Sequence, residues 1–272
     1  MLLAPILVIV IGILAGGLIN ILADDLPHDR LPHAPRYADG TLRPRGAWLG
    51  ILAFATGKHI APDGKRMRWR YPLTEIATAA GMVIALLVKN ARTDVSDVQL
   101  IFWLIYVFIM VLVTVIDLEQ RLILFSVMIP AYIIAILDAI FTPTQREPGV
   151  PESLIAGAVG FGVYYILYQG GNLYVHIQNQ RGRNIDTPAF GFGDVMLSTL
   201  SGLILGPGAL ILAMFITVFA GAAGSVIYLI TRLFSKEGYV PFTPLPYGQY
   251  IVLGLFLMLF FGSQMRYMII GY

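Results

Sequence analysis

The sequence predicts an all-α polytopic membrane protein, in which eight transmembrane helices carry a small cytoplasmic subdomain between the first and second helices. Two observations predict this fold class. Of the 272 residues, 57% are hydrophobic and only 12% are charged, whereas a soluble domain carries about 25% charged residues. Long apolar segments also alternate with short polar ones along most of the chain. Such a composition cannot cover a water-facing surface, and most of the surface must therefore face lipid.

The first apolar segment, Leu2–Ala23, is predicted to be a retained membrane-spanning helix. It holds 22 residues without a charge, enough at 1.5 Å per residue to cross a hydrocarbon core of about 30 Å. It lacks the basic start and the small-residue cleavage site of a signal peptide.

Residues 24–72 have a different composition and are predicted to form the cytoplasmic subdomain. They hold nine of the 18 basic residues, three of the four histidines and turn-forming pairs such as Asp39-Gly40. We expect Trp48, Phe54 and Trp69, with neighbouring aliphatic side chains, to hold this subdomain together. The chain then divides into a first helix (1–23), this loop (24–72) and a seven-helix membrane core (73–272).

The seven helices of the core are predicted from six apolar runs. One run of 37 uncharged residues is too long for one span, and Gly206-Pro207-Gly208 is expected to divide it. In another run, Gly157, Gly160 and Gly162 supply a small-residue face for close helix packing. The runs are Leu73–Val88, Val98–Ile116, Leu122–Phe141, Ser153–Tyr168, Val195–Thr231 and Leu245–Met265.

Charge and cysteine content exclude several classes of function. The net charge of +2 is too small to indicate nucleic-acid binding, and the absence of cysteine excludes disulfides, thiolate zinc sites and a cysteine nucleophile. With eight spans, the loops on one side hold 14 Lys and Arg residues and the other side holds four. The positive-inside rule therefore predicts that residues 24–72 lie in the cytoplasm and that both termini lie outside.

Acidic residues at membrane depth are costly and mark candidate functional sites. Asp117 ends one predicted helix, and Asp194 begins another within Gly191-Phe192-Gly193-Asp194. By the predicted topology, both lie at the cytoplasmic end of their helices. Glu75 lies one turn into its helix, whereas Asp138 is expected at the opposite, outer interface, where it would be solvated.

Two carboxylates at one site can divide general acid–base work. One accepts a proton from water while the other protonates the carbonyl oxygen or the leaving group. Gly191 and Gly193 would let backbone and substrate approach closely because glycine has no Cβ. On the other hand, Asp194 could be a simple helix cap and Asp117 a polar helix end. The aromatic residues Trp103, Tyr106, Tyr164, Tyr165 and Tyr168 are expected to be interfacial anchors.

Five ordered motifs are similar to those of the type IV prepilin peptidases, also called leader peptidase/N-methyltransferases. The first is GGLINILADDLP at Gly16–Pro27, and the second is RYPLTE at residues 70–75. Ile116-Asp117-Leu118, followed by Leu122-Ile123, resembles the first catalytic motif of the family. Residues 191–197 resemble its Gly-x-Gly-Asp motif, and Val240–Pro244 resembles the segment before its last helix.

The resemblance implies a membrane aspartic endopeptidase of the bacterial cytoplasmic membrane that cuts the basic leader from prepilin or pseudopilin precursors. Asp117 and Asp194 would be catalytic, and proteolysis would need no cofactor. The other candidate site residues, which would bind substrate, are Gly191, Gly193, Asp24, Asp25, Asp29 and Glu75. Of these, the three aspartates would steer the basic leader, and Glu75 is expected to accept a hydrogen bond from a neighbouring helix or loop.

The chain departs from the family in three places. Ile123-Leu124 replaces the usual Ile-Pro, Met196 replaces a usual lysine, and the two Cys-x-x-Cys pairs that bind zinc are absent. Since His28, His33 and His59 lack the spacing of a ligand set, we expect no metal. The family also uses S-adenosylmethionine to methylate the new N-terminus, and nothing in the sequence identifies a site for it.

Two other classes of function use the same residues. A proton-coupled transporter could use the carboxylates as a relay, but its acidic residues would lie near the membrane midplane. A catalytically silent scaffold of a pilus or secretion machine would not need both aspartates.

Overall fold

The computed structural model describes residues 3–144, 147–182, 190–233 and 246–270. Within these residues every named element is a helix, and the only β contacts are two isolated bridges. The chain divides into two compact units, Met1–Gln120 and Arg121–Tyr272, which we describe separately. The expected division into a first helix, a cytoplasmic loop and a seven-helix core stays a prediction.

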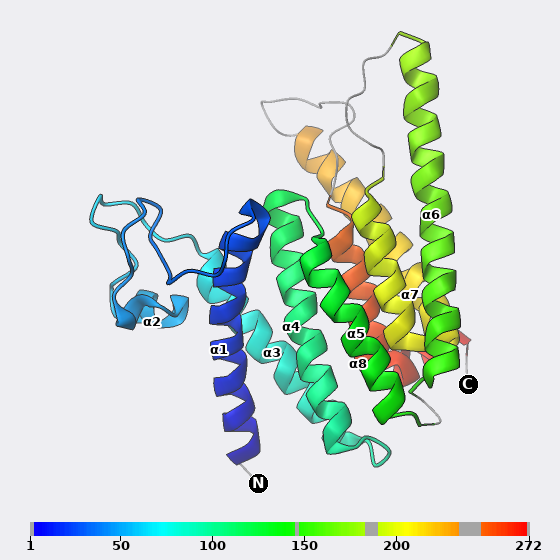
Figure 1. Ribbon diagram of the computed structural model, residues 1–272, viewed down its shortest axis with the longest axis horizontal. Coiled ribbons are helices and arrows are strands. Elements are labelled where there is room, and N and C mark those ends of the chain that lie inside the picture. Colours follow the sequence, from blue (N-terminus) through cyan, green and yellow to red (C-terminus); the bar gives the residue numbers. More distant parts are fainter. Residues whose placement is uncertain (1–2, 145–146, 183–189, 234–245, 271–272) are drawn as a thin grey trace. The chain divides into compact units, whose positions relative to one another are not determined.

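The first unit is built on three long helices that pack on one another (Figure 1). These are α1 (Leu3–Asp25), α3 (Arg70–Ala91) and α4 (Asp97–Gln120). The connection from α1 to α3 contains two short 3₁₀ helices, Leu26–His28 and Arg45–Ala47, and the helix α2 (Gly50–Ala55). The long helices follow directly from the apolar runs, and their bounds agree with the predicted ones to within a few residues.

Small residues let α1 and α3 approach closely. A Cβ placed on Gly12 would lie 2.5 Å from the Cα of Ala79, and one on Gly16 would lie 2.5 Å from the Cα of Glu75. Four residues further along the same face of α1, the Asn20 side-chain amide donates to the backbone oxygen of Tyr71 at 3.0 Å. Glycines spaced by four residues are a usual means of close helix packing in membranes. Asn20 adds a polar contact to that interface.

The loop between α1 and α3 has a small core of its own. Two turns are closed by the bridges between Arg36 and Leu42 and between Ile60 and Arg66. The core consists of the buried side chains of Ala47, Ala53 and Met67, with Phe54 and Tyr71 packed against them. Of the three aromatic residues expected here, Phe54 joins this core, and Trp69 packs on the Phe54 ring with centroids 4.6 Å apart although it is largely exposed. The expected role is wrong for Trp48, which is exposed and outside the core.

The second unit contains four helices. They are α5 (Phe125–Phe141), α6 (Val150–Gln180), α7 (Phe192–Leu233) and α8 (Gly248–Ile270). Helix α7 packs against each of the other three (Figure 1). Its 42 residues are interrupted at Gly206, whose φ of 70° and ψ of 175° are not helical. Glycine reaches this region without the steric cost of a Cβ, and the chain therefore breaks where the Gly206-Pro207-Gly208 turn was predicted.

Close packing between α6 and α7 depends on two of the three predicted glycines. A Cβ on Gly160 would lie 2.5 Å from the backbone oxygen of Ser198, and one on Gly157 would lie 2.8 Å from the Leu203 side chain. Gly162 lies elsewhere on the helix, and a Cβ there would meet nothing within 4 Å. The small-residue face thus includes Gly157 and Gly160 and excludes Gly162.

Six helices of the described residues are long and apolar enough to cross a membrane, and they indicate a multi-pass membrane protein. The predicted count of eight differs in two places. Helix α5 has only 17 residues, because Leu122–Leu124 do not join it, and α7 counts as one helix despite its break at Gly206. The count of eight and the cytoplasmic placement of the loop remain predictions. Large apolar side chains on α1, including Leu3, Leu7 and Leu14, are exposed and available to lipid.

The predicted role as an interfacial anchor is wrong for three of the five aromatic residues. Trp103, Tyr106 and Tyr164 are 0%, 1% and 3% exposed, respectively, and belong to the packed interior. Trp103 and Tyr106 lie three residues apart on α4, on the same face as the buried residues Met110 and Val113. Tyr165 is exposed, as an anchor requires.

Candidate active site

Asp194 lies in the first turn of α7, as its sequence position predicts. Its backbone N–H donates to the oxygen of Gly191 at 3.2 Å, and this contact closes the turn that leads into the helix. The side chain is 8% exposed. Gly191 itself is exposed, and a Cβ there would find its nearest neighbour, an Asp194 carboxylate oxygen, at 3.5 Å. Among the described residues, a side chain at 191 would therefore make only ordinary contacts.

Gly193 serves a different purpose from Gly191. A Cβ on Gly193 would lie 2.8 Å from the Cβ of Ile123, which is closer than side chains can approach. Ile123 belongs to the short segment between α4 and α5, and Phe125, at the start of α5, stacks on Phe192 with ring centroids 6.2 Å apart. The missing side chain of Gly193 thus lets the segment after Asp117 pack against the start of α7.

Three aromatic residues in the second unit form a group connected to Asp194 that the sequence did not single out for catalysis. The rings of Tyr164 and Phe190 are 5.7 Å apart, and those of Phe190 and Tyr247 are 5.5 Å apart. Burial, and after it the negative charge of Asp194, raises the pKa of Tyr247 above its ordinary value. The Tyr247 hydroxyl is therefore protonated at neutral pH. The only sequence signal was a tyrosine directly after the Pro-rich segment that precedes α8.

Asp117 lies in the last turn of α4, as predicted, and is 5% exposed. It belongs to the first unit, whereas Asp194, Gly191 and Gly193 belong to the second. Ile123 follows Asp117 by six residues and lies in the second unit, where it contacts Gly193. This contact links the segment after Asp117 to the turn that holds Asp194.

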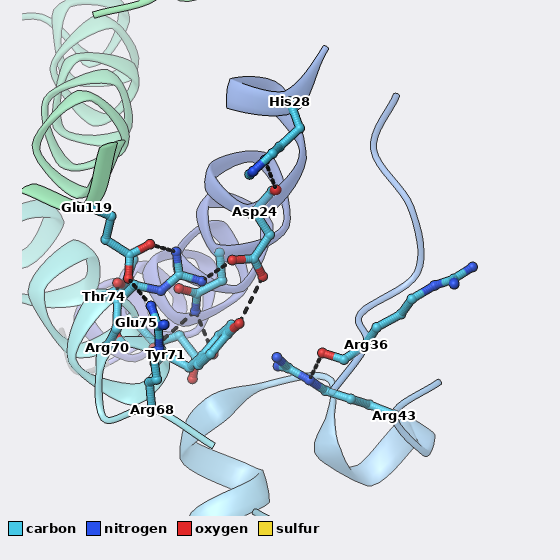
Figure 2. A network of polar contacts seen from close by, with 11 residues as sticks. Asp24, His28, Arg36, Arg43, Arg68, Arg70, Tyr71, Thr74, Glu75 and Glu119 are labelled. Carbon is cyan, nitrogen blue, oxygen red and sulfur yellow. Dashed lines mark hydrogen bonds and ion pairs between the residues drawn. The ribbon is translucent and has the colours of Figure 1, made fainter. Parts of the chain in front are cut away.

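The three predicted steering aspartates have different surroundings. Asp24 accepts hydrogen bonds from Arg70 at 2.5 Å and from the Tyr71 hydroxyl at 3.0 Å (Figure 2). Asp25 accepts a hydrogen bond from the backbone N–H of His33 at 2.7 Å. Asp29 is exposed and adopts a left-handed conformation with a φ of 54°. Asp24 is exposed as well, but its charge is offset by Arg70.

Glu75 is fully buried and holds the loop against α3. Its two carboxylate oxygens accept hydrogen bonds from the backbone N–H groups of Gly50 at 2.5 Å and Ile51 at 2.8 Å. The Asn20 amide lies 3.4 Å away as a further donor. Glu75 therefore accepts hydrogen bonds from a neighbouring loop and helix, as expected, and its 0% exposure leaves no surface for direct contact with a substrate.

Asp138 was predicted to be solvated, and this prediction is wrong. It is 9% exposed, and one carboxylate oxygen accepts a hydrogen bond from the hydroxyl of Thr142. The hydroxyl also donates to the backbone oxygen of Asp138 at 2.9 Å. The physical reason is local, because residues four apart lie on one face of a helix. This contact caps the end of α5.

The three loop histidines have separate environments. His28 lies 3.2 Å from the backbone oxygen of Asp24, His33 lies 3.7 Å from the Asp25 carboxylate, and His59 stacks on Phe54. In the part of the chain that the structure describes, no group of three or more His, Cys, Asp or Glu residues is arranged to hold a metal ion. Val240–Pro244, the motif expected before the last helix, lies outside the described residues.

These features define a class of protein: a multi-pass helical membrane protein that holds an aspartate in a glycine-flanked turn at the start of a helix. The model of the type IV leader peptidase family matches residues 104–226, a segment that includes Asp117, Gly191, Gly193 and Asp194. This match supports the resemblance to leader peptidases that the motifs indicated. Comparisons with curated proteins and with solved structures found no match.

Proposed function

We propose that this protein is a membrane aspartic endopeptidase that removes the basic leader from type IV prepilin or pseudopilin precursors. The observation that carries the proposal is the position of Asp194 in the glycine-flanked turn at the start of α7, within the segment matched by the leader peptidase family. The contact of Ile123 with Gly193 supports the pairing of this turn with the Asp117 motif. The acidic residues lie in the end turns of their helices, which favours a peptidase over a midplane proton relay.

In the proposed reaction, Asp117 and Asp194 act on one water molecule. The ionised carboxylate takes a proton from the water as its oxygen attacks the scissile carbonyl carbon, while the neutral acid protonates the carbonyl oxygen. The tetrahedral intermediate then loses the amine, which takes the proton from the newly protonated carboxyl as the C–N bond breaks. As the carbonyl forms again, one hydroxyl of the intermediate returns its proton to the other carboxylate, and both aspartates regain their starting states. The positive end of the α7 dipole favours the carboxylate at Asp194, and the negative end of α4 favours the acid at Asp117, by about 0.3–1 kcal/mol each.

The proposed substrate is a basic leader, and the acidic residues at the end of α1 would steer it by long-range attraction. Because Asp24 is bound to Arg70, Asp29 and the partly exposed Asp25 carry most of this role. We also propose that the protein lies in the bacterial cytoplasmic membrane with residues 24–72 on the inside, as the distribution of basic residues predicts. Methylation of the new N-terminus with S-adenosylmethionine remains a possible second activity, and no described residue is assigned to that cofactor.

The test is cleavage of candidate prepilin and pseudopilin precursors by the purified full chain, followed by mass analysis of the mature N-terminus. The proposal expects removal of the leader at a single bond by the wild type. Asp117→Asn and Asp194→Asn should each abolish it, whereas Asp138→Asn, a change of the same chemistry outside the proposed site, should leave it largely intact. A mass increase of one methyl group after addition of S-adenosylmethionine would establish the second activity. Cleavage by either active-site variant at the wild-type rate would refute the aspartic mechanism.

A further inference from the structure

The first unit contains a polar cavity of about 930 Å³ that the peptidase reaction does not explain. It is lined by the end of α1, the start of α3, Glu119 near the end of α4 and the loop between α1 and α3. Seven basic side chains line it against three acidic ones. A cavity of this size and charge is suited to an anionic ligand.

Two of the three acidic residues of the cavity form ion pairs with arginine. Arg70 bridges Asp24 at 2.5 Å and Glu119 at 2.8 Å, and Arg68 lies 3.5 Å from the same glutamate. The third, Asp25, accepts a hydrogen bond from the backbone N–H of His33 at 2.7 Å. Lys65 pairs with Asp63 at 3.2 Å. Among the described residues, no carboxylate forms an ion pair with the other lining cations, which are Arg30, Arg36, Arg43 and Arg66.

Arg43 is the most informative of these four cations, because it is only 5% exposed. Its Nε donates to the backbone oxygen of Arg36 at 2.8 Å, and its guanidinium lies over the Tyr71 ring at 4.1 Å (Figure 2). Within the described part of the chain, its Nη groups donate to no protein acceptor. A buried cation without a carboxylate is costly, and the guanidinium fork is shaped for two oxygens of one anion.

The helices place this cavity at one end of three candidate membrane spans. Arg70 is the first residue of α3, α1 ends at Asp25, and Glu119 is the penultimate residue of α4. At the ends of membrane-spanning helices, side chains meet the level of the lipid headgroups, where basic pockets bind anionic phosphates. Residues 24–72, which supply most of the cavity lining, hold nine of the 18 Lys and Arg residues of the chain.

We propose that this cavity binds a phosphate group, with Arg43 as the buried contact, and that an anionic phospholipid headgroup supplies it. Arg66 and Arg36 are the exposed contacts, and the Arg36 side chain, which points away from the Arg43 guanidinium (Figure 2), turns toward the phosphate on binding. The site involves neither Asp117 nor Asp194. Phosphate binding can therefore be tested independently of the proposed peptidase reaction. A bound headgroup would neutralise the unpaired cations and tie the loop to the membrane surface.

The test uses the full chain purified in detergent and titrated with short-chain phosphatidylglycerol, with short-chain phosphatidylcholine or with inorganic phosphate. Binding is measured by native mass spectrometry and by the rise in Tm. We expect saturable binding of phosphatidylglycerol and little binding of phosphatidylcholine. Arg36→Gln and Arg66→Gln should each weaken that binding about tenfold, the usual effect of losing one charge-assisted contact.

The matched control is Arg45→Gln. Arg45 is exposed and belongs to the same loop but does not line the cavity, and its substitution should leave affinity unchanged. Arg43→Lys keeps the positive charge and removes the forked guanidinium group. It should weaken the binding of phosphatidylglycerol while the unliganded protein stays folded. Equal weakening by Arg45→Gln, or equal binding of the two lipids without any binding of inorganic phosphate, would overturn the proposal. A further outcome is that inorganic phosphate binds in a way that needs Arg36 and Arg66, while phosphatidylglycerol binds no better than phosphatidylcholine. That result would support the phosphate site and overturn the proposal that a lipid headgroup supplies the phosphate.

Discussion

Gly193 lies against Ile123, and a Cβ added to this glycine would come within 2.8 Å of the isoleucine Cβ. The two residues belong to motifs 70 positions apart in the sequence: one directly precedes Asp194, and the other follows Asp117 by six residues. The contact gives the second glycine of Gly-x-Gly-Asp a packing role. A Cβ on Gly191 would make only ordinary contacts with the described residues, and the two glycines of the motif therefore have different physical requirements.

This difference predicts that Gly193→Ala damages the enzyme far more than Gly191→Ala. The new methyl group at 193 must displace Ile123, and overpacking of this kind costs about 1–3 kcal/mol. At 191 the nearest atom to the new methyl group is 3.5 Å away, which is ordinary contact. We expect a loss of about tenfold or more in kcat/KM for Gly193→Ala and a smaller one for Gly191→Ala, measured with one precursor.

A second substitution tests the cause of that loss. Ile123→Gly removes the Cβ, Cγ1 and Cδ1 atoms that the new methyl group would meet, and it should restore part of the activity of Gly193→Ala. If the double variant is no more active than Gly193→Ala alone, the loss comes from backbone conformation, and the packing explanation is wrong.

Glu75 is predicted to matter for stability and not for substrate binding. Glu75→Leu leaves the N–H groups of Gly50 and Ile51 without an acceptor, and each buried orphan donor costs about 1–3 kcal/mol. Thermal unfolding in detergent should show a lower Tm, and limited proteolysis should cut residues 26–69 more readily. Glu75→Gln keeps one acceptor oxygen and should fall between the Leu variant and the wild type. A raised KM in Glu75→Gln with unchanged Tm would instead indicate contact with the substrate.

The long helices of this protein could be predicted from the sequence because apolar composition over about 20 residues is sufficient for a membrane span. The break in α7 at Gly206 could be predicted for the same reason, since no single span needs 42 residues. The length of α5 could not. Its start depends on Leu122–Leu124 taking an extended path between two helices, and those residues are as apolar as the helix that follows them.

The individual polar contacts were harder to predict. That Glu75 needs hydrogen-bond donors followed from its depth in the membrane, but their identity depends on the path of the loop that brings Gly50 beside it. Asp138 was expected in solvent because it lies near the end of an apolar run. Its spacing of four residues from Thr142 is the signal that would have predicted the buried contact.

The predicted orientation can be tested with single cysteines, because the chain contains none. Ala38 lies in the loop after α1, and Thr93 lies in the turn between α3 and α4; both are exposed. Ala38 is a better site than its neighbour Gly40, whose φ of 85° disfavours a side chain. An impermeant maleimide should label Thr93→Cys in intact cells, and it should label Ala38→Cys only after the membrane is permeabilised. Labelling of Ala38→Cys in intact cells would reverse the topology and place the loop outside.

The final prediction is that Asp117 and Asp194 act as one unit. Two carboxylates that share one water molecule depend on each other for their protonation state, so that neither retains its function after the other is lost. Asp117→Asn and Asp194→Asn should therefore each reduce cleavage to background, and the double variant should be no less active than either single one. The amide is nearly isosteric with the carboxylate, and each variant should keep the wild-type Tm to within a few degrees. Additive losses in the double variant would mean that the two residues act on separate steps, and a shared water molecule would then be excluded.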